Sequence, residues 1–177
     1  MRRSERVHLA RFLEWERACT LRLNRTAMSR EWVGVLAAVS KLSDGGVWFA
    51  LMAVLALIGP DGKQCALHMV LAGATATVLY KVLKSFTGRP RPCERLDDVQ
   101  PCVVPLDEFS FPSGHVLHAV TFTTVAVAYY PSLALGLVPF TMLVALSRVA
   151  LGLHYPSDVL AGAGIGWLIA LVSFHFV

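Results

Sequence analysis

The stretch SRVALGLHYPSD, residues 147–158, joins two long apolar runs and places an arginine, a histidine and an aspartate between them. The two runs, 132–150 and 157–177, are each close to the roughly 20 residues that a helix needs to cross a bilayer. Ionisable side chains beside such runs are costly, so they favour a functional site over separate groups that snorkel to water. Whether the three side chains act together depends on what the rest of the chain brings to the same face.

Composition places the chain among integral membrane proteins. Of its 177 residues, 55% are hydrophobic and 16% are charged, whereas a soluble domain carries about 25% charged residues. Short connectors with proline or glycine separate the apolar segments, so one domain is expected. We therefore predict an all-α, polytopic transmembrane helical bundle over residues 31–177. The apolar segments expected to form its helices are 46–59, 64–86, 113–130, 132–150 and 157–177.

An earlier apolar segment, residues 33–42, is short. As a helix it would be about 15 Å long, against a hydrocarbon core of about 30 Å. It can cross the membrane as a tilted helix with polar ends, or dip in and return at KLSDGG, residues 41–46. We predict that it crosses, which gives about six spans.

Residues 1–30 contain eight arginines against three glutamates and lack the continuous apolar run of a secretory signal. Because aromatic and leucine side chains are interspersed with the arginines, we expect an amphipathic interfacial helix along the cytoplasmic headgroups, and no binding of nucleic acid. With six spans, the positive-inside rule then places the loops 87–112 and 150–156 on the opposite, outward face.

The first group of polar residues on that face is KSFTGRPRP, residues 84–92. Gly88 can end the preceding helix, and the two Arg–Pro pairs enforce extended backbone after it. This geometry can fold Arg91 back towards the ammonium group of Lys84, with Arg89 inside the interval. Cations gathered in this way predict an anionic ligand.

The second group is FPSGH, residues 111–115, at the start of the next predicted helix. Its proline suits a first helical turn. The N–H groups of Ser113, Gly114 and His115 would then point out of the helix N-terminus as a cradle for an anion. The imidazole of His115 would stand at the rim, where it can donate a proton to a leaving oxygen. Taken alone, this short motif is explained about as well by an ordinary helix start.

The third group is the stretch 147–158. Arg148 falls in the last turn of one helix, and Asp158 falls in the first turn of the next. His154 falls in the loop between them, because Tyr155 precedes a proline and disfavours helical geometry. The carboxylate of Asp158 can accept a hydrogen bond from one imidazole nitrogen of His154 and leave the other facing a substrate. The alternative for Asp158 is a purely structural helix cap.

Together the three groups describe a phosphoryl-transfer site. By the predicted helix count they lie on one membrane face, where they supply three cations, a helix N-terminus and two histidines. Such a set stabilises charge on the oxygens of a phosphoryl group and aligns attack with departure. These residues alone do not decide which histidine is the nucleophile.

The three motifs also resemble a known family. K-x6-RP, PSGH and SR-x5-H-x3-D stand at 84–92, 112–115 and 147–158, in the order found in the type 2 phosphatidic acid phosphatase superfamily. These are membrane lipid phosphate phosphatases, related in pocket design to vanadium haloperoxidases. The resemblance implies a metal-independent phosphatase without a cofactor that removes the terminal phosphate from a membrane lipid phosphate or diphosphate. It implies a place in the bacterial cytoplasmic (inner) membrane, and the predicted topology turns the site towards the periplasm or outer side.

The resemblance also assigns roles. His154 would attack phosphorus and form a phosphohistidine, Asp158 would orient it and stabilise its charge, and His115 would protonate the leaving oxygen and later activate water. Bacterial relatives act on undecaprenyl diphosphate, phosphatidylglycerol phosphate, phosphatidic acid or lipid A; the residues neither choose among these nor predict an oligomeric state. The implied phosphate-binding residues are Lys84, Arg91, Ser113, Gly114 and Arg148.

Other functions stay open on the sequence alone. An intramembrane ion or proton transporter could use the same histidines and arginines. Gly162, Gly164 and Gly166 could be cited for it, but small residues at this spacing favour close helix packing. A metal shared by His115 and His118 is disfavoured, because His118 lies one turn inside an apolar helix. We predict no metal. The acids expected to be solvated loop charges are Asp97, Asp98, Asp107 and Glu108.

Cys93 and Cys102 bracket the loop CERLDDVQPC on the predicted outward face. If that face is periplasmic, a disulfide between them is chemically permitted and would restrain the loop beside the site. The sequence supplies no Cα separation, so the disulfide is a hypothesis.

Overall fold

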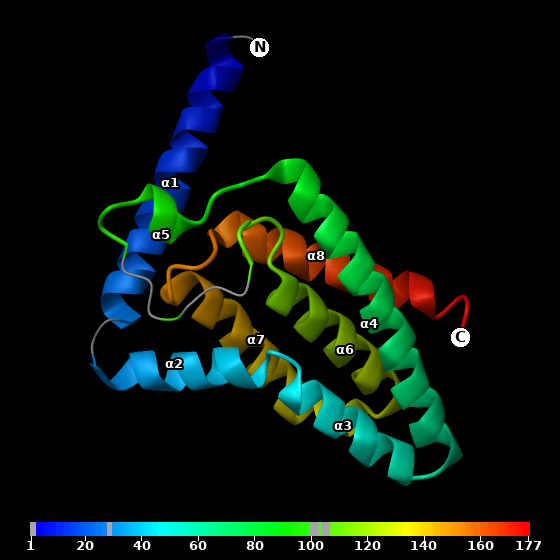
Figure 1. Ribbon diagram of the computed structural model, residues 1–177. Coiled ribbons are helices and arrows are strands. Elements are labelled where there is room, and N and C mark those ends of the chain that lie inside the picture. The colour runs from blue at the N-terminus through cyan, green and yellow to red at the C-terminus, as the bar shows by residue number, and fades with distance from the viewer. Residues whose placement is uncertain (1–2, 28–29, 100–102, 104–106) are drawn as a thin grey trace.

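The computed structural model of the chain describes residues 3–27, 30–99, 103 and 107–177. Within these ranges all regular structure is helical (Figure 1), which confirms the predicted all-α fold. The helices are α1 (Arg3–Ala27), α2 (Arg30–Leu42), α3 (Gly46–Leu57), α4 (Pro60–Thr87), α5 (Pro92–Arg95), α6 (Gly114–Tyr129), the 3-10 turn η1 (Pro131–Leu133), α7 (Ala134–Ala150) and α8 (Pro156–Ser173).

The long helices begin and end where proline and glycine require it. α4 begins at Pro60, a first-turn position where the missing N–H has no partner to lose. It ends at Gly88, whose φ of 53° lies in the left-handed region. α8 begins at Pro156 in the same way as α4. The five predicted helices correspond to α3, α4, α6, α7 and α8, with ends shifted by a few residues.

α6 lies in the centre of the bundle and packs against α4, α7 and α8 (Figure 1). Two glycines of α8 permit the close approach. A Cβ atom on Gly162 would lie 2.6 Å from the carbonyl oxygen of Ser113, and one on Gly166 would lie 2.3 Å from that of Leu117. The predicted role in close helix packing is confirmed for Gly162 and Gly166, which removes them as support for a transport path; a Cβ on Gly164 would meet nothing within 4 Å.

In the part of the chain that the structure describes, three helical segments are long and apolar enough to cross a membrane: Pro60–Arg95, Pro131–Ala150 and Pro156–Ser173. The bent pair formed by residues 32–42 and 46–57, with an angle of 49° between its halves, makes a fourth if it counts as one span. Between 22% and 28% of the most apolar window of each single segment is buried inside the protein. Most of this apolar surface therefore faces outward, as it does in helices that contact lipid.

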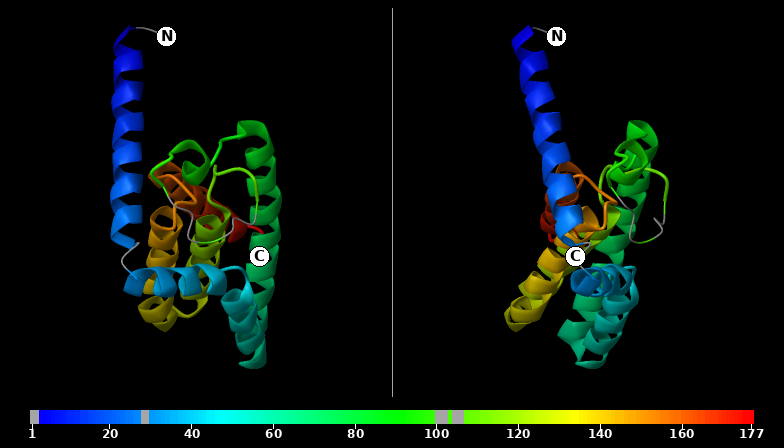
Figure 2. Two further views of the ribbon diagram at one scale, coloured as in Figure 1. Left: turned by 60° about the vertical axis from the view of Figure 1, so that its left-hand side comes forward. Right: turned by 90° about the vertical axis from the view of Figure 1, so that its left-hand side faces the viewer.

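α2 corrects one prediction. Just before its start, the amide of Asn24, near the end of α1, donates to the carbonyl of Ala150, at the C-terminal end of α7. At its end, the hydroxyl of Ser40 binds Arg148, and Asp44 binds His115 at the start of α6. Both ends of α2 therefore lie at one end of the bundle, and Figure 2 shows α2 roughly perpendicular to α4.

The predicted crossing by residues 33–42 is therefore wrong, and the predicted count of six spans is not confirmed. The physical reason is length: the segment is too short to span, and its apolar face is used instead against α7.

α1 extends away from the bundle beyond the ends of α4 and α8 (Figures 1 and 2). Its contacts are made by its second half, where Glu16, Thr20 and Asn24 are buried against α7 and α8. Because α2 does not cross, the arginine-rich helix lies on the same face as the loops that carry the motifs. The predicted surface attachment of residues 1–30 stays a prediction.

Candidate active site

The candidate active site lies where four helices meet. α4 and α7 end there, and α6 and α8 begin there. Antiparallel connection of consecutive helices brings the three motifs to this one end. The N–H of Ser113 at the start of α6 donates to the carbonyl of Asp158 in α8 at 3.0 Å, which fixes the two helix starts side by side.

His154 is 1% exposed and is held by a backbone carbonyl. Its Nδ1 lies 2.7 Å from the carbonyl oxygen of Ser110. A carbonyl only accepts, so the proton of the neutral ring is on Nδ1 and Nε2 carries the free lone pair. Nε2 lies 3.4 Å from Nη1 of Arg91, which also donates to the carbonyl of Leu153 at 2.8 Å. The nitrogen with the lone pair thus faces a buried guanidinium.

Asp158 does not make the hydrogen bond that the sequence predicts. Its Oδ2 is 3.8 Å from Nδ1 of His154, beyond hydrogen-bond distance. The carboxylate instead accepts from the N–H of Tyr155 at 2.8 Å, as a helix cap does, and from Arg89 at 2.6 Å. The prediction failed because the Ser110 carbonyl, 44 residues away in sequence, lies closer to the ring.

Burial lowers the pKa of His154 well below its ordinary value of 6.5, and the positive charges of Arg148, Arg91 and Lys84 lower it further. The hydrogen bond to Ser110 opposes this shift. The imidazole is therefore neutral at physiological pH, which is the state a nucleophile needs.

Lys84 and Arg91 are buried and converge on one carboxylate oxygen. Oδ1 of Asp107 lies 2.5 Å from Nζ of Lys84 and 2.5 Å from Nη2 of Arg91. Lys84 also donates to the carbonyl of Phe109 at 2.8 Å. The predicted folding of Arg91 back towards Lys84 is thus present, and a carboxylate oxygen occupies the position between the cations.

Asp107 was expected to be a solvated loop charge, and that prediction is wrong. Its side chain is 40% exposed but pairs with both cations. Burial alone would raise the pKa of Asp107, but the hydrogen bond and charge of Lys84, together with Arg91, hold it below the ordinary value. No sequence signal marks this residue, because its position depends on how the loop closes over α4.

The anion cradle at the start of α6 is smaller than predicted. α6 begins at Gly114, and Ser113 is its N-cap residue. The N–H of Ser113 already binds Asp158, so only the N–H groups that follow it are left for an anion. The hydroxyl of Ser113 is fully buried, and within the described part of the chain it has no hydrogen-bond partner.

Arg148 is 3% exposed and donates from Nη1 to the hydroxyl of Ser40. Its Nε is buried, again without a partner among the described residues. Buried polar groups are normally satisfied. Three such atoms occur in the described ranges, and two of them, on Ser113 and Arg148, belong to predicted phosphate-binding residues. A tetrahedral oxyanion would supply acceptors for both.

His115 lies at the rim of the site and binds Asp44, which follows α2. The sequence predicts His115 but not this partner, because the two are 71 residues apart. Burial and the charge of Arg148 lower the pKa of His115 to about 4, whereas Asp44 favours a proton on the ring. The negative charge of a phosphate would offset that of Arg148, so that the ring can hold a proton and return it.

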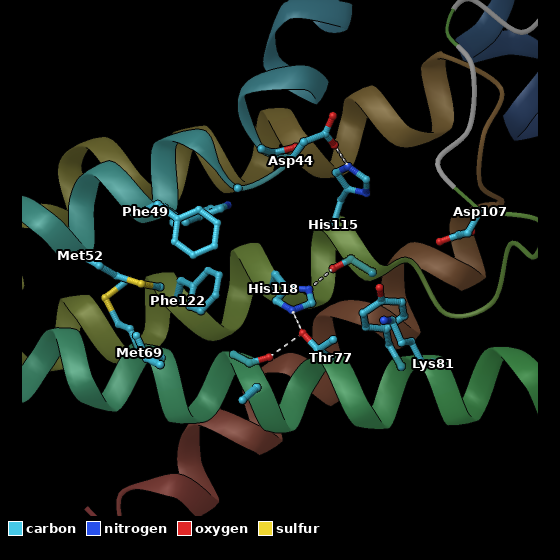
Figure 3. A pocket seen from close by; sticks show the side chains of 18 residues that line it. Asp44, Phe49, Met52, Met69, Thr77, Lys81, Asp107, His115, His118 and Phe122 are labelled. Carbon is cyan, nitrogen blue, oxygen red and sulfur yellow. Dashed lines mark hydrogen bonds and ion pairs between the residues drawn. The ribbon is translucent and has the colours of Figure 1, made fainter.

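A cavity of about 500 Å³ opens beside His115, between α3, α4 and α6 (Figure 3). Its polar end is lined by Asp44, Asp107 and His115. The apolar lining comes from large side chains of α3, α4 and α6, all buried in the bundle except the exposed Phe49. These are Trp48, Phe49, Met52, Met69 and Phe122.

His118 lines the same cavity, and both of its ring nitrogens are engaged. Nδ1 lies 2.9 Å from the carbonyl of Gly114, and Nε2 lies 3.0 Å from the hydroxyl of Thr77 (Figure 3). Neither nitrogen points to His115 as a shared metal ligand would require. Among the residues that the structure describes, no three His, Cys, Asp or Glu side chains cluster as metal ligands.

The predicted disulfide cannot be placed. Cys93 lies in α5, whereas Cys102 lies outside the described residues. The disulfide stays a prediction.

Fold and site together define a class: an integral membrane protein of helices, with a group of buried cations at one end of the bundle and an apolar cavity beside it. Known proteins supply the particular family. The model of the PAP2 superfamily matches residues 65–177, and the chain belongs to this superfamily.

Similar relatives are named as phosphatases. An undecaprenyl-diphosphatase of Sulfolobus acidocaldarius is 30% identical over 142 residues, with 79% of this chain and 68% of the relative covered. A decaprenylphosphoryl-5-phosphoribose phosphatase of Mycobacterium tuberculosis is 34% identical over 146 residues, 75% of each chain. A phosphatidylglycerophosphatase B of Haemophilus influenzae is 35% identical over 79 residues, and the chain spans 33% of its length.

Solved structures show the same fold. Aquifex aeolicus LpxE superposes with a TM-score of 0.75 and 30% identity, with 92% of this chain and 94% of that chain covered. A transmembrane PAP2 type phosphatidylglycerolphosphate phosphatase from Bacillus subtilis has a TM-score of 0.72 and 26% identity, with 93% and 85% covered.

Proposed function

We propose that this protein is a metal-independent phosphatase that removes the terminal phosphate from a membrane lipid phosphate or diphosphate. One observation carries the proposal: among the described residues, the buried Ser113 hydroxyl and Arg148 Nε lack hydrogen-bond partners, and the charge of Arg148 interacts with those of the buried Lys84 and Arg91. Buried cations and unsatisfied polar atoms together call for an anion with several oxygens. A terminal phosphate has that form.

His154 is the proposed nucleophile. The lone pair on Nε2 attacks phosphorus and forms an N–P bond, while the bond from phosphorus to the lipid oxygen breaks. His115 gives its proton to that leaving oxygen. Water then attacks the phosphohistidine and loses a proton to His115, which releases inorganic phosphate and restores Nε2.

The phosphate-binding groups stabilise charge on the transferring phosphoryl group. Arg91 is placed for this by its 3.4 Å separation from Nε2 of His154. Lys84, Arg148, the Ser113 hydroxyl and the N–H of Gly114 complete the proposed set. Asp158, 3.8 Å from Nδ1, stabilises the positive charge that the ring gains when its other nitrogen bonds to phosphorus.

The lipid part of the substrate fits the cavity beside His115. Its polar end adjoins the site and its deeper lining is apolar, so a headgroup can reach the cations while a hydrocarbon chain stays out of water. The relatives act, by their names, on prenyl-linked and glycerol-linked phosphates. Undecaprenyl diphosphate, phosphatidylglycerol phosphate, phosphatidic acid and lipid A are therefore the substrates to screen.

The proposed location is the cytoplasmic membrane of a bacterium. The outward orientation of the site was predicted from a crossing by residues 33–42 that the structure does not contain. Because α1 and the site share one face, the positive-inside rule no longer supports that orientation. A reporter inserted into the 87–112 loop of the protein in whole cells decides which face carries the site.

The function is tested by phosphate release. Purified protein in detergent, supplied with each lipid phosphate and EDTA, is expected to release inorganic phosphate, and His154→Ala is expected to abolish the release. His8→Ala, an exposed histidine of α1, is the matched control and should keep wild-type activity. Release that survives in His154→Ala would contradict the assigned nucleophile. Ion or proton flux in liposomes without phosphate release would favour the transporter.

A further inference from the structure

α1 lies outside the residues that match the family, yet one of its side chains reaches the site. Glu16 is 1% exposed, although most of α1 is exposed. One turn and two turns further on, Thr20 and Asn24 are buried as well. α1 is therefore docked on the site face by a polar stripe of these three residues, of which Glu16 is the charged member.

The Glu16 carboxylate binds two segments of the site. Oε2 accepts from Nη2 of Arg89 at 2.7 Å. Oε1 accepts from the N–H of Ser157 at 3.2 Å and from the Ser157 hydroxyl. Ser157 is in the first turn of α8, so the carboxylate lies at the positive end of that helix. Glu16 thus ties α1 both to the segment after α4 and to the helix start that carries Asp158.

Arg89 lies between two carboxylates. Its Nη1 donates to Oδ1 of Asp158 at 2.6 Å, while its Nη2 binds Glu16. The guanidinium carbon lies 4.3 Å from the centre of the Tyr155 ring, a stacking contact that favours the cation. A planar guanidinium engaged at both ends and stacked on a ring has a fixed orientation.

The formal charges show what Glu16 adds. Arg89 and Asp158 form a neutral pair by themselves, and with Glu16 the trio carries one net negative charge. That charge lies beside His154, because Asp158 is 3.8 Å from Nδ1. The ring becomes positive when it bonds to phosphorus, and a negative charge at this distance stabilises that state.

We propose that Glu16 is a positioning residue of the active site. Glu16 shares the guanidinium of Arg89 with Asp158, and it thereby keeps the Asp158 carboxylate in place and leaves a net negative charge beside His154. The proposal rests on the proposed phosphohistidine mechanism. It makes the N-terminal helix, which carries none of the family motifs, a part of the catalytic apparatus.

The other charged groups that face His154 are cations from other elements: Lys84 of α4, Arg91 after it, and Arg148 of α7. Asp107 pairs with the first two of these cations. All three cations are proposed to bind the substrate phosphate. The trio of Glu16, Arg89 and Asp158 is therefore the negative group beside the ring, and it lies at Nδ1 rather than at Nε2, the nitrogen that attacks phosphorus.

Glu16→Gln tests the proposal, because it removes the charge and keeps the shape. We expect kcat to fall about 10- to 100-fold, with a much smaller change in KM. We also expect the titration of His154, followed by 15N NMR of histidine-labelled protein, to move to lower pH, because a negative charge is lost. Glu14→Gln, an exposed acid of the same helix, is the matched control and should change neither. Glu16→Asp should recover part of kcat.

A merely structural role for Glu16 predicts the opposite titration. Loosening the loop would admit water to His154 and move its titration up, towards the ordinary value of about 6.5. That upward shift, or a kcat equal to that of Glu14→Gln, would overturn the proposal.

A double variant keeps the test decisive if Glu16→Gln does not fold. Glu16→Gln/Arg89→Gln removes one charge of each sign and leaves one net negative charge beside His154. Its His154 is expected to titrate close to the wild-type pH, and a shift to lower pH would refute the charge argument. Absence of phosphate release from the wild type would refute the proposed function instead, whereas an active wild type indifferent to Glu16 refutes this inference alone.

Discussion

At the scale of single residues, the state of His154 is set by one backbone carbonyl. Ser110 accepts from Nδ1 at 2.7 Å, and this contact selects the tautomer that leaves Nε2 free. Every residue has a backbone carbonyl, so no side-chain motif in the sequence predicts which one accepts this hydrogen bond. Ser110, just before the FPSGH motif, is held by its N–H, which donates to the carbonyl of Arg89 after the end of α4.

The charge state of His154 yields the first prediction. Burial and three cations lower its pKa, so protonation becomes harder and the neutral ring persists as the pH falls through about 6.5. Histidine-selective 15N NMR, with the His154 signal assigned by its loss in His154→Ala, is expected to show a neutral Nδ1–H ring at pH 6.5, where an ordinary histidine is half protonated. A ring already protonated at about pH 6.5, or protonated on Nε2 alone, would contradict the structure.

Asp107 yields the second prediction. Its carboxylate oxygen lies between Lys84 and Arg91, where a phosphate oxygen is proposed to bind. Asp107→Asn should strengthen inhibition by inorganic phosphate roughly two- to fivefold, because an ion pair of this exposure is worth about 1 kcal/mol or less. Glu108→Gln, the neighbouring exposed acid, is the control. Weaker inhibition in Asp107→Asn would mean that the carboxylate holds the two cations in place for substrate.

At the scale of elements, the direction of each helix explains why the motifs converge. α4 and α7 end at the site and α6 and α8 begin there, so basic groups arrive from C-terminal turns and N–H groups from N-terminal turns. The contact between α6 and α8 matters most for this geometry. Ser113 at the start of α6 is bonded to Asp158 in the first turn of α8.

The third prediction concerns that contact. Gly166→Ala would place a Cβ 2.3 Å from the Leu117 carbonyl, and backbone cannot move aside as a flexible side chain can. We expect a loss of about 1–3 kcal/mol in stability, which outweighs the gain of up to about 1 kcal/mol from replacing glycine in a helix. Gly164→Ala meets nothing within 4 Å and is the matched control. Thermal unfolding in detergent measures both; equal midpoints would contradict the packing argument.

At the scale of the whole molecule, the polar site at one end of the bundle adjoins an apolar cavity inside it. The cavity of about 500 Å³ runs from the rim at His115 between α3, α4 and α6. The outer surfaces of the spanning segments are apolar. A lipid substrate can therefore meet the cations without leaving an apolar environment.

The fourth prediction tests this cavity. Val70→Trp narrows it, because Val70 lines the cavity on α4. We expect a higher KM for a long-chain lipid phosphate and an unchanged kcat/KM for a short, water-soluble phosphate ester. Leu71→Trp, the next residue of α4, lines a separate apolar groove and is the control. Equal effects on both substrates would place the lipid chain elsewhere.

The sequence alone determined the helical bundle and five of its helices, α3, α4, α6, α7 and α8, because these depend on apolar length and on the positions of proline and glycine. It also determined that the motif residues gather at one end of the bundle, because consecutive helices alternate in direction. These residues are Lys84, Arg91, His115, Arg148 and His154. The family, found through the same motifs, is confirmed.

Only the tertiary structure decided the path of α2 and the partners of the motif residues. Asp44 on His115, Asp107 on Lys84, Ser110 on His154 and Glu16 on Arg89 each join segments far apart in the chain. Local patterns specify which side chains are available and which way a helix runs. Which two of them meet is set by how loops close and how helices pack, and that is a property of the whole fold.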